Sequence, residues 1–113
     1  MIELSETVGR LTVTLKAQPI GLDWNILVYG GNLPHVGAVA LASPNTTCSV
    51  LCLPNHREGE IAERIASAIV EHVNASVCVT CGIHLDNITQ HEICSVGDII
   101  KMFISELVAR IQS

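Results

Sequence analysis

The sequence predicts a two-layer α+β domain, in which helices cover one face of a mostly antiparallel sheet. Three observations lead to this prediction. Short apolar segments alternate with turn residues in the first half of the chain, as β-strands do. Two later segments have apolar residues at helical spacing, and one strand-like segment lies between them. A length of 113 residues fits a single domain, which we expect to span residues 1–113.

The predicted strands begin at residue 11. Apolar residues occupy every second position over residues 11–17, which is typical of a half-buried strand. Further strands are predicted over residues 23–29, 36–42 and about 48–53. A turn with Pro19 precedes the first of them, and a turn with Pro44 separates the last two. Because the connections are short enough for hairpins, we expect these strands to form an antiparallel meander.

The second half predicts two helices. Ile61, Ile65, Ile69 and Val73 recur every four residues, which indicates an amphipathic helix over about residues 58–73. A strand is predicted over residues 76–83. The last helix carries one wide apolar stripe, formed by Val96, Ile99, Ile100, Phe103, Ile104, Leu107, Val108 and Ile111.

The composition limits the function. The chain is 49% hydrophobic and only 15% charged, whereas charged residues usually make up about 25%. Because one small core cannot cover so much apolar surface, we expect a homodimer or a larger homo-oligomer. The net charge of −5 argues against a nucleic-acid surface, which needs clustered basic residues.

Neither a membrane segment nor a secretion signal is predicted. No apolar stretch approaches the roughly 20 residues of a spanning helix, and the first residues lack a basic region and an apolar core. We therefore expect a cytoplasmic protein, in which the five cysteines are reduced and structural. Cys78 and Cys81 have redox-pair spacing, but a strand would place their thiols on opposite faces, and Cys48 and Cys52 are likewise expected to be packing residues.

A glycine-rich loop between two apolar segments is the most informative motif. It contains Gly30, Gly31, Pro34, His35 and Gly37. Glycine lets a ligand approach the main chain closely, and proline stiffens the loop. We expect a rigid loop at the mouth of the sheet that carries one imidazole, although glycine and proline are also ordinary turn residues.

Three of the five histidines, His35, His56 and His84, lie at the ends of predicted strands or helices. They would form a cluster if their loops share one edge of the sheet. Neutral imidazoles bind metals, and protonated ones bind anions such as phosphate, as helix N-termini do. No His-x-x-x-His pair, Walker motif or dinucleotide fingerprint is present. His72 lies among charges on the first predicted helix and receives no role.

Four blocks of the sequence resemble a known family. Residues 30–37 hold Gly-Gly-x-x-Pro-His-x-Gly, residues 54–56 are Pro-Asn-His, residues 63–66 are Glu-Arg-Ile-Ala, and residues 81–89 contain Gly-Ile-His. In this order they resemble the prenylated-flavin chaperones that accompany gallate-type decarboxylases, where the relative is the small D subunit. The resemblance covers most of residues 20–90.

The resemblance implies a fold like that of the proteasome assembly chaperones and a non-enzymatic role. The protein would carry prenylated flavin mononucleotide and assist maturation of an apo-decarboxylase for aromatic or unsaturated acids. No catalytic residue and no metal is expected, and the binding of unmodified flavin mononucleotide stays open. The implied cofactor-binding residues are Gly30, Gly31, Pro34, His35, Gly37, His56, Gly82 and His84.

The chain departs from the family pattern at a few positions. Asp86 and Asn87 stand where Asn-Gln is expected, and Cys81 stands where alanine is usual. Trp24 and Tyr29 are the aromatic candidates for stacking near the loop. Two other functions stay open. One is a metal-dependent enzyme built on His35, His56 and His84, with Glu58 or Asp86 as the carboxylate, and the other is an assembly factor without a small ligand.

Overall fold

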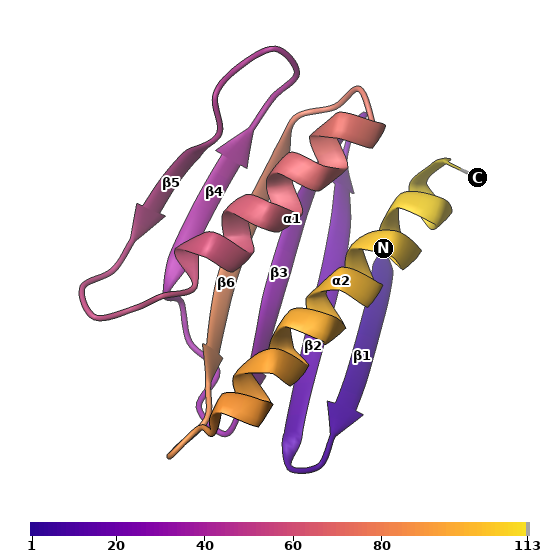
Figure 1. Cartoon of the computed structure of the whole chain (residues 1–113). Coiled ribbons are helices and arrows are strands. Elements are labelled where there is room, and N and C mark those ends of the chain that lie inside the picture. Colours follow the sequence, from indigo (N-terminus) through magenta and orange to yellow (C-terminus); the bar gives the residue numbers. More distant parts are fainter. Residues whose placement is uncertain (113) are drawn as a thin grey trace.

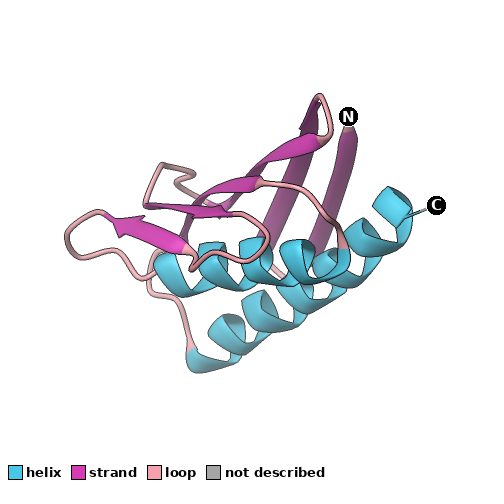
Figure 2. Cartoon of the chain, turned by 90° about the horizontal axis from the view of Figure 1, so that it is seen from above, coloured by secondary structure: helices cyan, strands magenta, loops and turns pink. Residues whose placement is uncertain are grey.

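A computed structural model of the chain describes residues 1–112 as a six-stranded sheet and two helices. Figure 1 shows both helices lying across the same face of the sheet, and Figure 2 shows the two layers from above. The predicted two-layer α+β class is confirmed. The elements are β1 (Ile2–Val8), β2 (Leu11–Ile20), β3 (Asp23–Gly31), β4 (Ala38–Ala42), β5 (Ser49–Cys52), α1 (Gly59–His72), β6 (Val77–His84) and α2 (Gln90–Gln112).

The sheet has the strand order β1-β2-β3-β6-β4-β5. Adjacent strands are antiparallel except at the centre, where β6 lies between β3 and β4 and runs parallel to β3. The predicted meander is therefore wrong between β3 and β4, whereas the predicted antiparallel pairing of β4 with β5 is confirmed. Residues 32–37, which we call the crossing segment, pass over the end of β6 instead of folding back as a hairpin.

Main-chain hydrogen bonds hold the crossing segment on β6. The N–H of Asn32 donates to the carbonyl oxygen of His84 over 2.9 Å, and the N–H of Gly37 donates to that of Cys81 over 2.9 Å. Strand β4 consequently begins at Ala38 and not at residue 36 as predicted. Strand β1 was not predicted, because Glu6 interrupts the alternation of Ile2, Leu4 and Val8 with polar residues.

The core lies between the sheet and the helices. Each helix contributes a buried stripe, and burial of each large apolar side chain stabilises the fold by about 1.5–3 kcal/mol. Neither helix of residues 1–112 covers the other face of the sheet, and Leu27, Leu41 and Leu51 are exposed there. The largest fully buried side chains are Leu11, Leu15, Ile26, Ile65, Ile69, Ile100, Leu107, Val13, Val28, Val77, Val79 and Cys81.

All five cysteines are free thiols. Cys81 is buried, and burial, with the nearby Glu58 charge as a second cause, raises the pKa of its thiol to about 12. Cys78 lies on the other face of β6, as the strand assignment predicted. Cys52 is exposed, so its expected role as a packing residue is wrong. Within residues 1–112, neither helix is both long and apolar enough to span a membrane.

Candidate functional site

Four candidate side chains, those of His35, His56, Glu58 and His84, lie at one end of the sheet. Strands β3 and β6 are parallel, so both end at this edge, and Gly31 lies beside His84 in their register. The crossing segment brings His35 over the edge, and the segment before α1 brings His56 and Glu58 to it. The structure thus places the three predicted histidines together.

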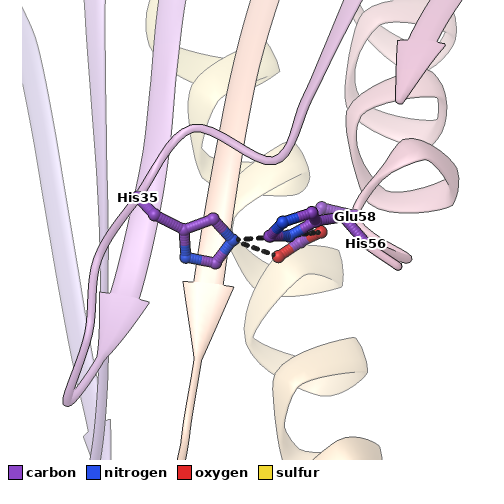
Figure 3. A group of neighbouring side chains, drawn as sticks. All are labelled: His35, His56 and Glu58. Carbon is purple, nitrogen blue, oxygen red and sulfur yellow. Dashed lines mark hydrogen bonds and ion pairs between the residues drawn. The ribbon is translucent and has the colours of Figure 1, made fainter. Parts of the chain in front are cut away.

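His35, His56 and Glu58 form what we call the buried cluster (Figure 3). Nε2 of His35 lies 2.7 Å from Oε1 of Glu58 and 3.0 Å from Nδ1 of His56. Nδ1 of His56 lies 3.5 Å from Oε2 of Glu58. All candidate ligand atoms lie within 4.8 Å of one another. His84 stands farther away, with its ring centre 6.3 Å from that of His35.

Glu58 is the only charged or polar residue that is buried among residues 1–112, and it is 7% exposed. Its Oε2 is buried without a hydrogen-bond partner. The residue precedes α1 at the N-cap position, yet its side chain makes no capping hydrogen bond. A buried carboxylate is costly unless it is paired, so the surroundings of Glu58 need a positive charge.

The hydrogen bonds of His35 define its protonation. Nδ1 lies 3.0 Å from the carbonyl oxygen of Leu33, which can only accept, so Nδ1 carries a proton. A neutral ring would then present the Nε2 lone pair to Oε1 of Glu58 at 2.7 Å, which is repulsive. A proton shared between Nε2 and Oε1, or another cation, must therefore stand between these atoms.

The glycines predicted to admit a ligand pack against the chain itself. A Cβ on Gly82 would overlap the carbonyl of His35, one on Gly31 would overlap the backbone of His84, and one on Gly30 would overlap Thr12. Gly31 also has a φ of 80°, which favours glycine. A Cβ on Gly37 would lie 2.6 Å from the carboxylate of Glu58. Close packing within the chain requires these glycines, and cofactor contact by their backbone stays a prediction.

A second group of polar residues lies at the same end of the sheet, closer to solvent. Nε2 of His84 donates to Asp86 over 2.9 Å. Asn32 and Asp86 bond reciprocally, since the Asn32 amide donates to Asp86 over 2.8 Å and receives the N–H of Asp86 over 2.9 Å. The donors His84 and Asn32 lower the pKa of the Asp86 carboxyl.

Arg10 extends this group from the turn between β1 and β2 to the start of α2. Its guanidinium donates to both carboxylate oxygens of Glu92, over 2.9 and 3.0 Å, and to the carbonyl of Asp86 over 2.9 Å. Glu92 and Thr89 form a capping box, because each side chain accepts the other's main-chain N–H. Arg10, followed by Thr89, lowers the pKa of Glu92 to about 2. We call Arg10, Asn32, His84, Asp86 and Glu92 the exposed network.

A shallow hollow of about 270 Å³ lies next to the buried cluster, on the sheet face without helices. Its wall is almost wholly apolar. Tyr29 is thus well placed for stacking. Trp24 is not, because it pairs with Val77 at the opposite end of β3, so its expected nearness to the loop is wrong. The lining residues are Leu27, Val28, Tyr29, Pro34, His35, Val36 and Thr80.

Sequence reasoning found the histidines but left out their partners. Glu58 and Asp86 were considered only as carboxylates for a metal-dependent enzyme, and Asn32 and Arg10 received no role. Glu58 gave only a weak signal, because it lies two residues after His56 and one residue before the helix. Arg10 gave none, because its partners are 76 or more positions away.

Comparison with known proteins identifies a matching family, a related protein and a solved structure of similar fold. Residues 7–112 match the family described as the prenylated flavin chaperone LpdD-like domain. Protein LpdD of Lactiplantibacillus plantarum is 29% identical over 101 residues, which cover 85% of this chain and 74% of that protein.

The third match is a solved structure, described as a novel chaperone complex for yeast 20S proteasome assembly. A chain of that structure superposes with a TM-score of 0.64 at 16% sequence identity, covering 97% of each chain. At this identity the likeness concerns the fold, and it confirms the expected proteasome-assembly-chaperone-like architecture.

Proposed function

Because this chain belongs to the prenylated flavin chaperone LpdD-like family, we propose that it binds prenylated flavin mononucleotide and assists maturation of a decarboxylase that uses this cofactor. In this function the protein is an accessory factor and not an enzyme. It holds the cofactor in the cytoplasm and releases it to the apo-decarboxylase. A carrier must release its cargo, so we expect a dissociation constant around micromolar, near −8 kcal/mol.

The observation that carries this proposal is the apolar hollow beside the family motif. Tyr29 offers an aromatic ring and Pro34 a rigid wall to a flat, largely apolar ring system. The hollow of about 270 Å³ is smaller than the roughly 300–1,000 Å³ of ordinary ligand pockets. One chain would therefore hold part of the flavin and leave the rest accessible.

Polar groups for the rest of the cofactor lie at the His35 end of the hollow. His35 lines the hollow and is in contact with His56. His84, half-exposed on the end of β6, offers a further imidazole. The first turn of α1 has no side-chain cap, and free N–H groups at a helix N-terminus favour a phosphate. We propose these groups, with the backbone of Gly30, Gly31, Gly37 and Gly82, as the cofactor contacts.

We further propose that the protein is a homodimer or a larger oligomer. The sheet face without helices leaves Leu27, Leu41 and Leu51 exposed, and Leu51 is 78% exposed. Burying this face would remove apolar surface from water and deepen the hollow. A monomeric mass by light scattering at micromolar concentration would contradict this part of the proposal.

The flavin proposal is tested by titrating the protein with prenylated flavin mononucleotide and following flavin fluorescence. We expect His84→Ala to weaken binding roughly ten- to a hundredfold, through the loss of one charge-assisted hydrogen bond of about 1.5–3 kcal/mol. The matched control is His72→Ala, which removes an exposed imidazole on α1 whose Nδ1 bonds the carbonyl oxygen of Ala68.

Absence of binding by the parent protein would contradict the flavin proposal and favour an assembly factor without a small ligand. A parallel titration with unmodified flavin mononucleotide shows whether the prenyl ring is required. Melting curves of each variant establish that the fold is intact.

A further inference from the structure

We propose that His35, His56 and Glu58 form a binding site for one divalent transition-metal ion of the zinc class. No comparison assigns such a site. The inference is independent of flavin binding, because it rests on the geometry and charge of the buried cluster alone.

The ligand atoms already have nearly the required spacing. Donors about 2.0–2.1 Å from a tetrahedral ion lie about 3.3 Å from one another. In the buried cluster, the Nε2–Nδ1, Nε2–Oε1 and Nδ1–Oε2 distances are 3.0, 2.7 and 3.5 Å. Small side-chain rotations would therefore admit an ion between His35, His56 and Glu58.

The outer hydrogen bonds favour metal binding over a purely structural histidine pair. His35 donates Nδ1–H to the carbonyl of Leu33, which fixes the ring and directs Nε2 towards Glu58. Ring nitrogens opposite a metal-bound nitrogen are usually held in this way. The second histidine, His56, is fixed less firmly, because its ring is on a loop and its side chain is 33% exposed.

The Oε2 atom of Glu58, which is buried without a hydrogen bond, is the independent sign of a missing cation. A proton on Nε2 of His35 can satisfy Oε1, but it leaves Oε2 buried without a hydrogen bond. No arginine or lysine forms an ion pair with this carboxylate in residues 1–112, where its ion-pair partners are His35 and His56. A divalent ion can bind the carboxylate and both rings, and so neutralise the buried charge.

The donor set indicates the class of ion. Two imidazole nitrogens and one carboxylate suit zinc and its first-row neighbours better than calcium or magnesium, which prefer oxygen ligands alone. Three protein ligands leave at least one coordination position for water or an anion. The side chain of His84 is not a ligand in this arrangement, because its Nε2 bonds Asp86.

The test is a calorimetric titration of metal-free protein with zinc chloride, in the absence of flavin. We expect one zinc ion per chain. Glu58→Gln keeps the shape of the side chain and His56→Ala alters a loop residue, and each should weaken binding roughly a hundredfold or more, at least as much as the loss of an outer partner. The matched controls His72→Ala and His91→Ala remove exposed histidines and should bind zinc as the parent does.

An exposed thiol is the competing ligand. Sγ of Cys52 lies 2.9 Å from the carbonyl oxygen of His56, so Cys52→Ser belongs in the same series. Retained binding in this variant supports the proposal. The proposal is overturned if the parent binds no zinc, if Glu58→Gln binds as tightly as the parent, or if Cys52→Ser alone abolishes binding. Circular dichroism of each metal-free variant confirms that it is folded.

Discussion

Two carboxylate sites lie at the same end of the sheet, and the chain treats them differently. In the exposed network, Glu92 is paired with Arg10 and Thr89, and Asp86 with His84 and Asn32. In the buried cluster, Glu58 is more deeply buried but has one oxygen without a hydrogen bond. Glu58, whose burial costs more free energy, thus has fewer hydrogen bonds than Glu92 or Asp86.

The difference concerns the need for a cation. The exposed network connects the β1–β2 turn to the start of α2 and pairs its carboxylates itself, so no cation is needed there. The buried cluster is held in place by the crossing segment, yet its charges are incompletely balanced. A buried polar group without a full set of partners is expected where a site is preorganised for a ligand.

The largest loss of stability should come from adding a Cβ atom where β6 contacts the crossing segment. In Gly82→Ala the new Cβ would overlap the carbonyl of His35. We expect a loss of about 3 kcal/mol or more in the free energy of unfolding, because backbone rather than a flexible side chain must move. Urea unfolding followed by circular dichroism measures this loss.

The matched control is Gly97→Ala in α2, where a Cβ would meet nothing within 4 Å. This variant should gain about 0.5–1 kcal/mol, since alanine favours the helix. Equal stability of the two variants would show that the close contact between β6 and the crossing segment is not as described.

Replacing Glu58 or Glu92 by glutamine should change the stability of the fold by a smaller amount, and in opposite directions. Glu58→Gln removes a buried charge while keeping its shape, so metal-free protein should be as stable as the parent or more stable by about 1 kcal/mol. Glu92→Gln loses the charge opposite Arg10 and should lower the melting temperature by a few degrees. Melting curves in the presence of a chelator compare the two, and destabilisation by Glu58→Gln as large as that by Glu92→Gln would remove the distinction.

The smallest effect should be a dependence of the fold's stability on pH that comes from Glu92 in the exposed network. The pKa of Glu92 falls from its ordinary 4.5 to about 2. Its contribution to stability is therefore complete above about pH 4.5 and is lost as the pH falls towards 2. Urea midpoints across this range should fall less steeply for Glu92→Gln than for the parent. Identical slopes, or a difference that high salt does not reduce, would contradict this assignment.

Local patterns predicted most of the fold. The helical period over 58–73 and the apolar stripe of α2 gave both helices, and alternation gave β2 directly. The position of β6 between β3 and β4 was missed because a six-residue connection fits a hairpin as well as a crossing. The close contacts that decide between them are those of Gly82 with His35 of the crossing segment and of Gly31 with His84 of β6, and these join distant parts of the chain.

The candidate site was also predictable only in part. Loop position identified His35, His56 and His84, since ends of strands gather at sheet edges. It could not show that Glu58 would be buried between two of them, because exposure depends on how the segment before α1 packs under Gly37. The pairing of His84 with Asp86 reflects a spacing of two residues, whereas that of Asn32 with Asp86 required the parallel register of β3 and β6.

The central claim is that the buried cluster lacks a cation which a metal ion supplies, while the exposed network lacks nothing. Long-range proton–nitrogen NMR spectra of the histidine rings, recorded before and after one equivalent of zinc, test it most directly. We predict that Nε2 of His35 and Nδ1 of His56 shift while Nδ1–H of His35 stays protonated, and that the rings of His84, His72 and His91 are unchanged. Unchanged spectra for His35 and His56, or shifts that centre on His84, would contradict the account.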